Sequence, residues 1–288
     1  MIGGMFILFL VLLLLNVPIA FSLGASSLFY LLTSNMNVAV LAQKFYAGID
    51  SFTLLCIPGF MLAGALMNGG GIPRRILNFC NAFLGHFTGS LALVNIVASM
   101  VFAGISGTAI ADVCSLGSML IPAMVEDGYD DDFSVAVTAA SSVVGPIIPP
   151  STNFILLGAT ISGLSITKLF MIGLFPGIFI GLALMVVWYF IVRIDGYNVT
   201  ITFSREEKWK IIRDAMPAFM MPVLLLGGIR FGVFTPTEGG AFAAIYAIIV
   251  CVGYYRELSF RGLLRVSARA ARTTAVVMLI VATATAVG

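Results

Sequence analysis

A short polar segment, Gly104-Ile105-Ser106-Gly107-Thr108, interrupts an apolar stretch over residues 87–125, and we call it the first break. In a bilayer, irregular backbone persists only where protein packs around it or where it lines a hydrated cavity. One half-helix would end here with free carbonyl groups and another would begin with free N–H groups, while Ser106 and Thr108 add two hydroxyls. The first break therefore offers ligands for a cation and for an anion.

A second polar segment, Gly145-Pro146-Ile147-Ile148-Pro149-Pro150, interrupts the apolar residues 133–162, and we call it the second break. Each proline removes the N–H that would bond the carbonyl four residues earlier, so the carbonyls of Ser142, Gly145 and Pro146 are expected to lack helical partners. Such oxygens suit a hard cation such as sodium. Glycine and proline also mark simple kinks in membrane helices, but two polar breaks in one chain favour a binding site.

Ser151, Thr152 and Asn153 follow the second break and open the next half-helix with side chains that can reach a polar substrate. Discontinuous helices of this kind form the binding sites of many secondary transporters. Asp112 lies one turn past the first break, and a carboxylate within a membrane indicates function by default. Its structural alternative is a hydrogen-bond anchor for a hairpin.

Glu238 has a structural explanation in the local sequence. Thr235, Pro236 and Glu238 occupy the N-cap, N1 and N3 positions of a capping box that would begin a helix. We therefore expect Glu238 to cap that helix.

The composition predicts an all-α integral membrane protein. Of 288 residues, 60% are hydrophobic and 10% are charged, whereas soluble domains carry about 25% charged residues. A hydrocarbon core about 30 Å thick needs roughly 20 apolar residues for each spanning helix, and the sequence offers such stretches repeatedly. The formal net charge is +2, and we expect the chain to contact a lipid bilayer and no nucleic acid.

Residues 2–33 form an apolar run that would be about 48 Å long as one helix, and Asn16-Val17-Pro18 is the natural place for a break. The run is either one long tilted helix or two short ones. The next span, 52–68, ends at the stop signal Asn68-Gly69-Gly70-Gly71. The other expected spans are the interrupted segments 87–125 and 133–162, then 168–192, 216–233 and 237–255, and a last run from Thr273 that is cut short at Gly288.

Lysine and arginine in the short loops would lie on one side of the membrane, which the positive-inside rule makes cytoplasmic. This alternation requires residues 87–125 to enter and leave on the same side, either as two full spans or as a re-entrant hairpin. The glycine and serine at the tip favour the hairpin. Residues 256–272 have arginines at helical spacing and predict a basic amphipathic arm at the cytoplasmic surface. Neither break has a lysine or arginine near it in the sequence, so no cation that would pair with an anionic ligand is visible.

Four motifs resemble those of a known family: residues 104–113, Ile121-Pro122-Ala123-Met124, residues 145–151, and residues 234–241. They are similar, in the same order, to the large membrane subunit of tripartite ATP-independent periplasmic (TRAP) transporters. The resemblance implies a sodium-driven symporter of organic acids in the bacterial inner membrane, with two inverted repeats and an elevator mechanism. It also implies two partners, a small four-helix membrane subunit and a periplasmic substrate-binding protein.

The resemblance carries over to particular positions. The residues that resemble a sodium site are Ser106, Thr108, Gly145, Ile148 and Pro150, and those that resemble the substrate side are Asp112 and Asn153, to which we add Ser151. Some relatives have serine in place of Asn153. The chain also stops before the second hairpin of the family and therefore resembles a C-terminally incomplete subunit.

The resemblance implies four sections of the chain. They are scaffold helices at 1–86, transport-domain elements at 87–162, a long span with a cytoplasmic amphipathic segment at 163–215, and the start of a second inverted repeat at 216–288. Pro18 and Pro236 each lie near the start of an expected helix. Aligning these two prolines gives a weak signal of an internal repeat.

An intramembrane serine protease is the alternative from another functional class, because Gly104-Ile105-Ser106-Gly107 fits a nucleophile pattern. Its serine needs a base within hydrogen-bond reach. The only histidine, His86, would lie roughly 26 Å away along a helix axis, which argues against the protease.

Two other functions complete the alternatives. An anion–sodium symporter that needs no binding protein fits the same polar breaks, and only the wording of the motifs favours the TRAP family. A purely structural membrane scaffold would have no use for paired polar breaks.

Overall fold

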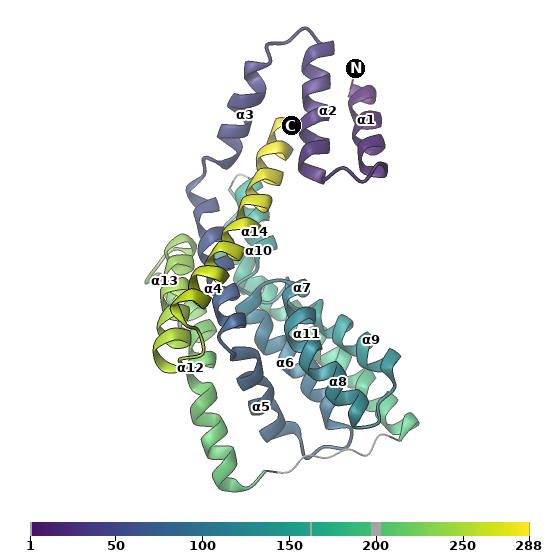
Figure 1. Ribbon diagram of the computed structural model, residues 1–288, viewed down its shortest axis with the longest axis vertical. Helices are drawn as coiled ribbons and strands as arrows, with labels where there is room; N and C mark the ends of the chain where they lie inside the picture. Colours follow the sequence, from purple (N-terminus) through teal and green to yellow (C-terminus); the bar gives the residue numbers. More distant parts are fainter. Residues whose placement is uncertain (1, 162, 197–202, 288) are drawn as a thin grey trace.

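The computed structural model describes residues 2–161, 163–196 and 203–287, and these residues form helices and connecting turns without a strand (Figure 1). Ser162 and Gly288, which end two of the expected spans, lie outside the described residues. Six helical stretches are long and apolar enough to cross a membrane: Phe52–Gly69, Ala109–Glu126, Ile166–Ile194, Arg205–Arg230, Pro236–Tyr254 and Phe260–Val287. The prediction of an all-α, multi-pass membrane protein is confirmed.

The N-terminal apolar run forms two short helices, α1 (Ile2–Leu14) and α2 (Ile19–Thr33), which pack against each other. The chain reverses at Asn16, whose φ of 62° lies in the left-handed region that asparagine tolerates. A helix that the sequence did not predict, α3 (Ala39–Ile49), and the short turn η1 (Phe52–Leu55) follow.

Helices α4 (Cys56–Gly69) and α5 (Ile72–Leu84) meet at the predicted glycine stop, where Gly71 has a φ of 74°. Arg75 of α5 forms ion pairs with Asp214 at 3.1 Å and with Glu257 at 2.7 Å, and its guanidinium stacks 3.6 Å from the centre of the Tyr255 ring. These contacts attach α5 to two later parts of the chain.

The segment expected as a hairpin folds back on itself. Helix α6 (Ser90–Ser106) ends at Gly107, and the returning arm consists of α7 (Ala109–Asp112), the π-helical turn η2 (Val113–Gly117) and α8 (Ser118–Glu126). Gly107, at the tip, is buried inside the protein. Ser106 and Thr108 beside it are half-buried and Ile110 is exposed, so the tip packs against the protein at Gly107 and is otherwise partly accessible.

The second interrupted segment is a discontinuous helix, as predicted. Helix α9 (Asp131–Ser142) stops before the second break, and α10 (Thr152–Thr160) begins after it. The long helix α11 (Ile166–Asp195) follows and packs against α6 and α10.

The last three helices differ from the predicted segments at two places. Helix α12 (Arg205–Arg230) joins the charged residues at its start to the following apolar span, so the expected division at residue 215 falls inside one helix. Helix α13 (Pro236–Ile248) continues into the π-helical turn η3 (Ile249–Tyr254). The basic residues 256–272 do not form an element of their own, because α14 (Phe260–Val287) continues from them into the apolar residues and has no proline to end it. Their place at the cytoplasmic surface stays a prediction.

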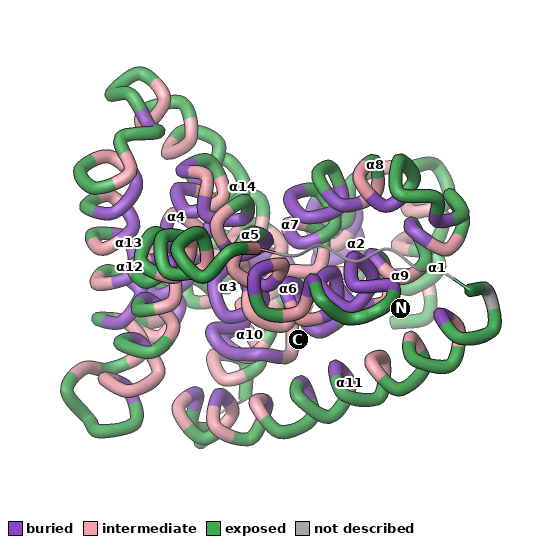
Figure 2. The backbone as a smooth tube through the Cα atoms, turned by 90° about the horizontal axis from the view of Figure 1, so that it is seen from below, coloured by how far each residue is buried: buried purple, intermediate pink, exposed green. Residues whose placement is uncertain are grey.

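The molecule is elongated, with α1, α2 and α3 at one end and the hairpin with α9 and α11 at the other (Figure 1). Helix α14 extends from the middle of the molecule to the first end and packs against α2, α3 and α4. Buried residues concentrate where α4, α5 and α6 meet (Figure 2). Many large apolar side chains on the outer surface are exposed, for example Phe175 and Phe179 of α11, as expected of a surface that contacts lipid.

Candidate functional site

The two breaks lie against each other. The Thr152 hydroxyl donates a hydrogen bond of 3.3 Å to the Gly107 carbonyl oxygen. A Cβ atom at Gly107 would lie 2.5 Å from the Pro150 carbonyl oxygen, and Gly107 also has a φ of 62°. Only glycine therefore permits this approach of the hairpin tip to the second break.

Asp112 lies where the two breaks meet. Its side chain is fully buried and accepts a short hydrogen bond from the Ser106 hydroxyl through Oδ1. Its other oxygen, Oδ2, has no hydrogen-bond partner among the described residues. A Cβ atom at Gly145 would lie 2.7 Å from this oxygen. The carboxylate thus contacts Ser106 and Gly145, two residues of the predicted sodium site.

The hydroxyls of the first break are partly engaged in local structure. Thr108 is the N-cap of α7 and accepts a hydrogen bond of 3.3 Å from the Ala111 N–H. Because a hydroxyl oxygen has two lone pairs, Thr108 keeps acceptor capacity for a ligand.

The prolines led us to expect that the carbonyls of Ser142, Gly145 and Pro146 lack partners, but two of the three accept hydrogen bonds. The Ser142 carbonyl accepts a hydrogen bond of 3.0 Å from the Gly145 N–H, and the Pro146 carbonyl accepts one of 2.5 Å from the Ser151 hydroxyl. Tight turns and a capping side chain therefore replace part of the missing helical bonding. The side chain of Ile148 is buried in a cluster with Ala103, so only its main chain can take part in ion binding.

Ser151, which we predicted on the substrate side, caps a helix. It is buried, and its hydroxyl accepts a hydrogen bond of 3.3 Å from the Phe154 N–H as the N-cap of α10. The same hydroxyl donates to the Pro146 carbonyl, so its proton and one of its two lone pairs are used within the second break. Serine is a preferred N-cap residue, so the position of Ser151 directly before a helix was a sequence signal for this capping role.

A cavity of about 500 Å³ lies beside the meeting point of the two breaks. Ser106, Thr108 and Asn153 line it, together with residues of α4 and α14. Its surface is mostly apolar with a few polar groups, which is typical of small-molecule sites. Of the residues predicted on the substrate side, Asn153 lines this cavity, whereas Asp112 and Ser151 do not.

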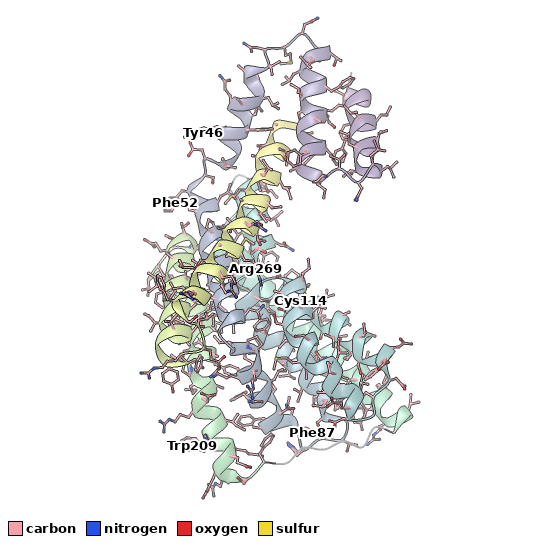
Figure 3. The ribbon with its side chains drawn as sticks, in the orientation of Figure 1. Tyr46, Phe52, Phe87, Cys114, Trp209 and Arg269 are labelled. Atoms are coloured by element: carbon pink, nitrogen blue, oxygen red, sulfur yellow. The ribbon has the colours of Figure 1, made fainter. Side chains whose placement is uncertain are left out.

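Arg269 of α14 also lines this cavity, together with Cys114 of the hairpin. Figure 3 shows both residues in the same middle part of the molecule. The sequence showed no cation near either break, because Arg269 is far from both along the chain and reaches the cavity only through the packing of α14. Cys114 is the one exposed cysteine of the four.

Two other polar residues that the sequence singled out, Glu238 and His86, lie outside the meeting point of the two breaks. Glu238 completes the predicted capping box, since its Oε2 accepts a hydrogen bond of 2.7 Å from the Thr235 N–H and the Thr235 hydroxyl accepts one of 3.3 Å from the Glu238 N–H. His86 precedes α6, whereas Ser106 ends it, so the helix separates them. Ser106 instead donates a hydrogen bond to the Asp112 carboxylate, and the described residues give this serine no histidine base.

A multi-pass helical membrane protein with two discontinuous segments that meet beside a cavity has the architecture of secondary transporters. Residues 6–288 match the family model described as "Tripartite ATP-independent periplasmic transporter, DctM component". The chain belongs to this family, which is a family of transporters and not of enzymes.

The chain is similar to several curated members of the family. It is 42% identical, over 95% of its length and 64% of the relative, to the sialic acid TRAP transporter large permease protein SiaM of Vibrio cholerae. It is 41% identical, over 98% of its length and 46% of the relative, to the sialic acid TRAP transporter permease protein SiaT of Haemophilus influenzae. It is 40% identical, over 94% of its length and 64% of the relative, to the 2,3-diketo-L-gulonate TRAP transporter large permease protein YiaN of Escherichia coli. The chain thus spans less than two thirds of the length of these relatives.

Proposed function

We propose that the chain is part of the large membrane subunit of a sodium-coupled secondary transporter that imports an organic acid across the bacterial inner membrane. The observation that supports this function best is the contact between the two breaks beside a cavity. The relatives support the substrate class, since their names specify sialic acid and 2,3-diketo-L-gulonate.

Sodium would bind at the contact between the breaks. The oxygen ligands would come from Ser106 and Thr108 and from the main chain of residues 145–150, because neither break alone supplies the several oxygens that a hard cation needs. The buried Oδ2 of Asp112, which has no partner among the described residues, supports a cation here. A buried carboxylate beside the ion would offset part of its desolvation.

Ion and substrate binding would be coupled through the hairpin tip. An ion that contacts both breaks holds the tip against the second break, and Ser106, Thr108 and Asn153 also line the neighbouring cavity. Each ligand would therefore stabilise the arrangement that the other binds, so each raises the affinity of the other.

An elevator mechanism requires a rigid body that carries the site. Buried hydrogen bonds join the hairpin to α9, with Asn95 donating to Thr138 at 2.6 Å and the hydroxyls of Ser99 and Ser141 3.0 Å apart. These contacts suit the proposed transport-domain elements at 87–162, which would move against scaffold helices.

Inverted repeats would account for two similar sets of packed helices. Helix α2 begins just after Pro18 and packs against α14, while α13 begins at Pro236 and packs against α4. We propose that α1, α2 and α4 correspond to α12, α13 and α14.

The transporter would work with a small four-helix membrane subunit and a periplasmic substrate-binding protein. A symporter that needs no binding protein fits the same site and is the second candidate. Reconstituting the full-length protein with the small subunit, with and without the binding protein, separates the two. Uptake of an organic acid that requires both a sodium gradient and the binding protein is expected. Uptake that does not respond to sodium would contradict the proposed coupling.

A further inference from the structure

We propose that Arg269 of α14 is the cation that binds the carboxylate of the substrate in the cavity beside the two breaks. The inference rests on the proposed function, because it assigns one residue of the same transport site. Nothing in the local sequence of either break indicates this residue.

The position of Arg269 is the first reason. It lines the cavity with Asn153, on the part of the wall that α14 supplies. All four arginines of α14, at positions 261, 265, 269 and 272, are exposed, but only Arg269 lines the cavity. Arg269 is thus the arginine of this helix that a ligand in the cavity would meet.

The charge of the cavity is the second reason. Arg269 forms no ion pair within the part of the chain that the structure describes. The nearby carboxylate of Asp112 is buried behind the hairpin tip, bonded to Ser106, and does not line the cavity. The cavity therefore presents a positive side chain without a matching negative one, which favours an anionic ligand.

The chemistry of the groups gives the ligand an orientation. A guanidinium binds a carboxylate through two parallel hydrogen bonds and is weakly hydrated, so it suits a partly apolar cavity. The Asn153 amide and the Thr152 hydroxyl, which also line the cavity, can bond the hydroxyl or carbonyl groups of the same substrate. A bound acid would thus connect α14 to the hairpin and α10.

The first experiment needs no substrate and uses the exposed Cys114 as a reporter. In the full-length protein with its partners, Cys114 is labelled with an anionic and a cationic methanethiosulfonate reagent of similar size, with Cys114→Ser as background. Arg269→Gln should lower the ratio of anionic to cationic labelling rates at least about fivefold, since it removes a charge beside the thiol. The matched control is Arg261→Gln, two turns or about 12 Å away along α14, which should change the ratio less than about twofold because of screening. If Arg269→Gln and Arg261→Gln change the labelling ratio equally, Arg269 does not lie at the cavity beside Cys114, and the inference is overturned.

The second experiment measures uptake of three acids that carry a carboxylate: sialic acid, 2,3-diketo-L-gulonate and succinate. For the acid that the wild type transports, Arg269→Gln should raise KM at least about tenfold, because a charge-assisted bond is lost. Arg269→Lys keeps the charge but not the paired hydrogen bonds, so it should keep the labelling ratio and still raise KM. An unchanged KM in both variants would overturn the inference. If the wild type transports none of the acids, the proposed function fails, and labelling alone decides whether Arg269 faces the cavity.

Discussion

The Thr152 hydroxyl donates a hydrogen bond of 3.3 Å to the carbonyl oxygen of Gly107, and this bond joins the start of α10 to the hairpin tip. The two residues belong to different polar breaks, so the bond connects the elements that would share a sodium ion. Thr152 also lines the cavity, so it would lie between the proposed sodium site and the proposed substrate site.

Replacing Thr152 with valine removes this hydroxyl with little change in volume. We expect the sodium concentration for half-maximal uptake to rise about threefold to tenfold, as for the loss of one hydrogen bond. Thr160→Val is the matched control, because that exposed hydroxyl bonds only within α10. Equal sodium activation curves for wild type and Thr152→Val would show that the bond does not support ion binding.

The double variant Ser106→Ala with Thr108→Ala tests the hydroxyls of the first break as sodium ligands. We expect sodium activation of uptake to weaken strongly, because two of the few oxygens near the ion are lost. Ser118→Ala, in the returning arm of the same hairpin, removes a hydroxyl that bonds the Ser115 carbonyl and should leave activation unchanged. Protein level and assembly with the partners are checked in parallel. If the double variant keeps the wild-type activation curve, the tip is a packing kink.

Asp112→Asn tests whether the buried carboxylate favours the ion. The change keeps the shape and removes the negative charge, so sodium affinity should fall at least about tenfold. Asp132→Asn, at an exposed position at the start of α9, should have no effect. Isothermal titration with sodium on the purified full-length protein measures the affinity directly. Normal sodium binding in Asp112→Asn would leave the carboxylate as a structural anchor.

The sequence was informative where structure depends on local chemistry. The glycines and prolines of the two breaks end helices by themselves, and the residues from Thr235 to Glu238 form their capping box within one turn. The sequence could not reveal Arg269, because its place at the cavity depends on the packing of a distant helix. It was also misleading at the charged start of α12, where the capping box of Ser204 and Glu207 begins a helix that continues into the apolar span.

Asn95→Ala tests the buried bonds between the hairpin and α9. The change removes the 2.6 Å bond to the Thr138 hydroxyl, which still donates to the Ser134 carbonyl, so the loss of one buried hydrogen bond should cost about 0.5–1.5 kcal/mol of stability. We expect a lower Tm in detergent. The double variant with Thr138→Ala should lose less than the sum of the single changes. Asn78→Ala, at an exposed position on α5, should leave Tm unchanged.

Gly107→Ala tests the approach of the hairpin tip to the second break. Two costs are expected, since Gly107 has a φ of 62° and a new Cβ atom would lie 2.5 Å from the Pro150 carbonyl oxygen. Gly128→Ala separates them, because Gly128 has a φ of 90° and nothing within 4 Å of its Cβ position. The control should lose only the conformational cost of about 1–2 kcal/mol. Gly107→Ala should also push the tip away from Pro150, so sodium activation and uptake should fall while the control retains both. If the two variants behave alike in uptake and in Tm, the contact between the tip and Pro150 does not hold the site together.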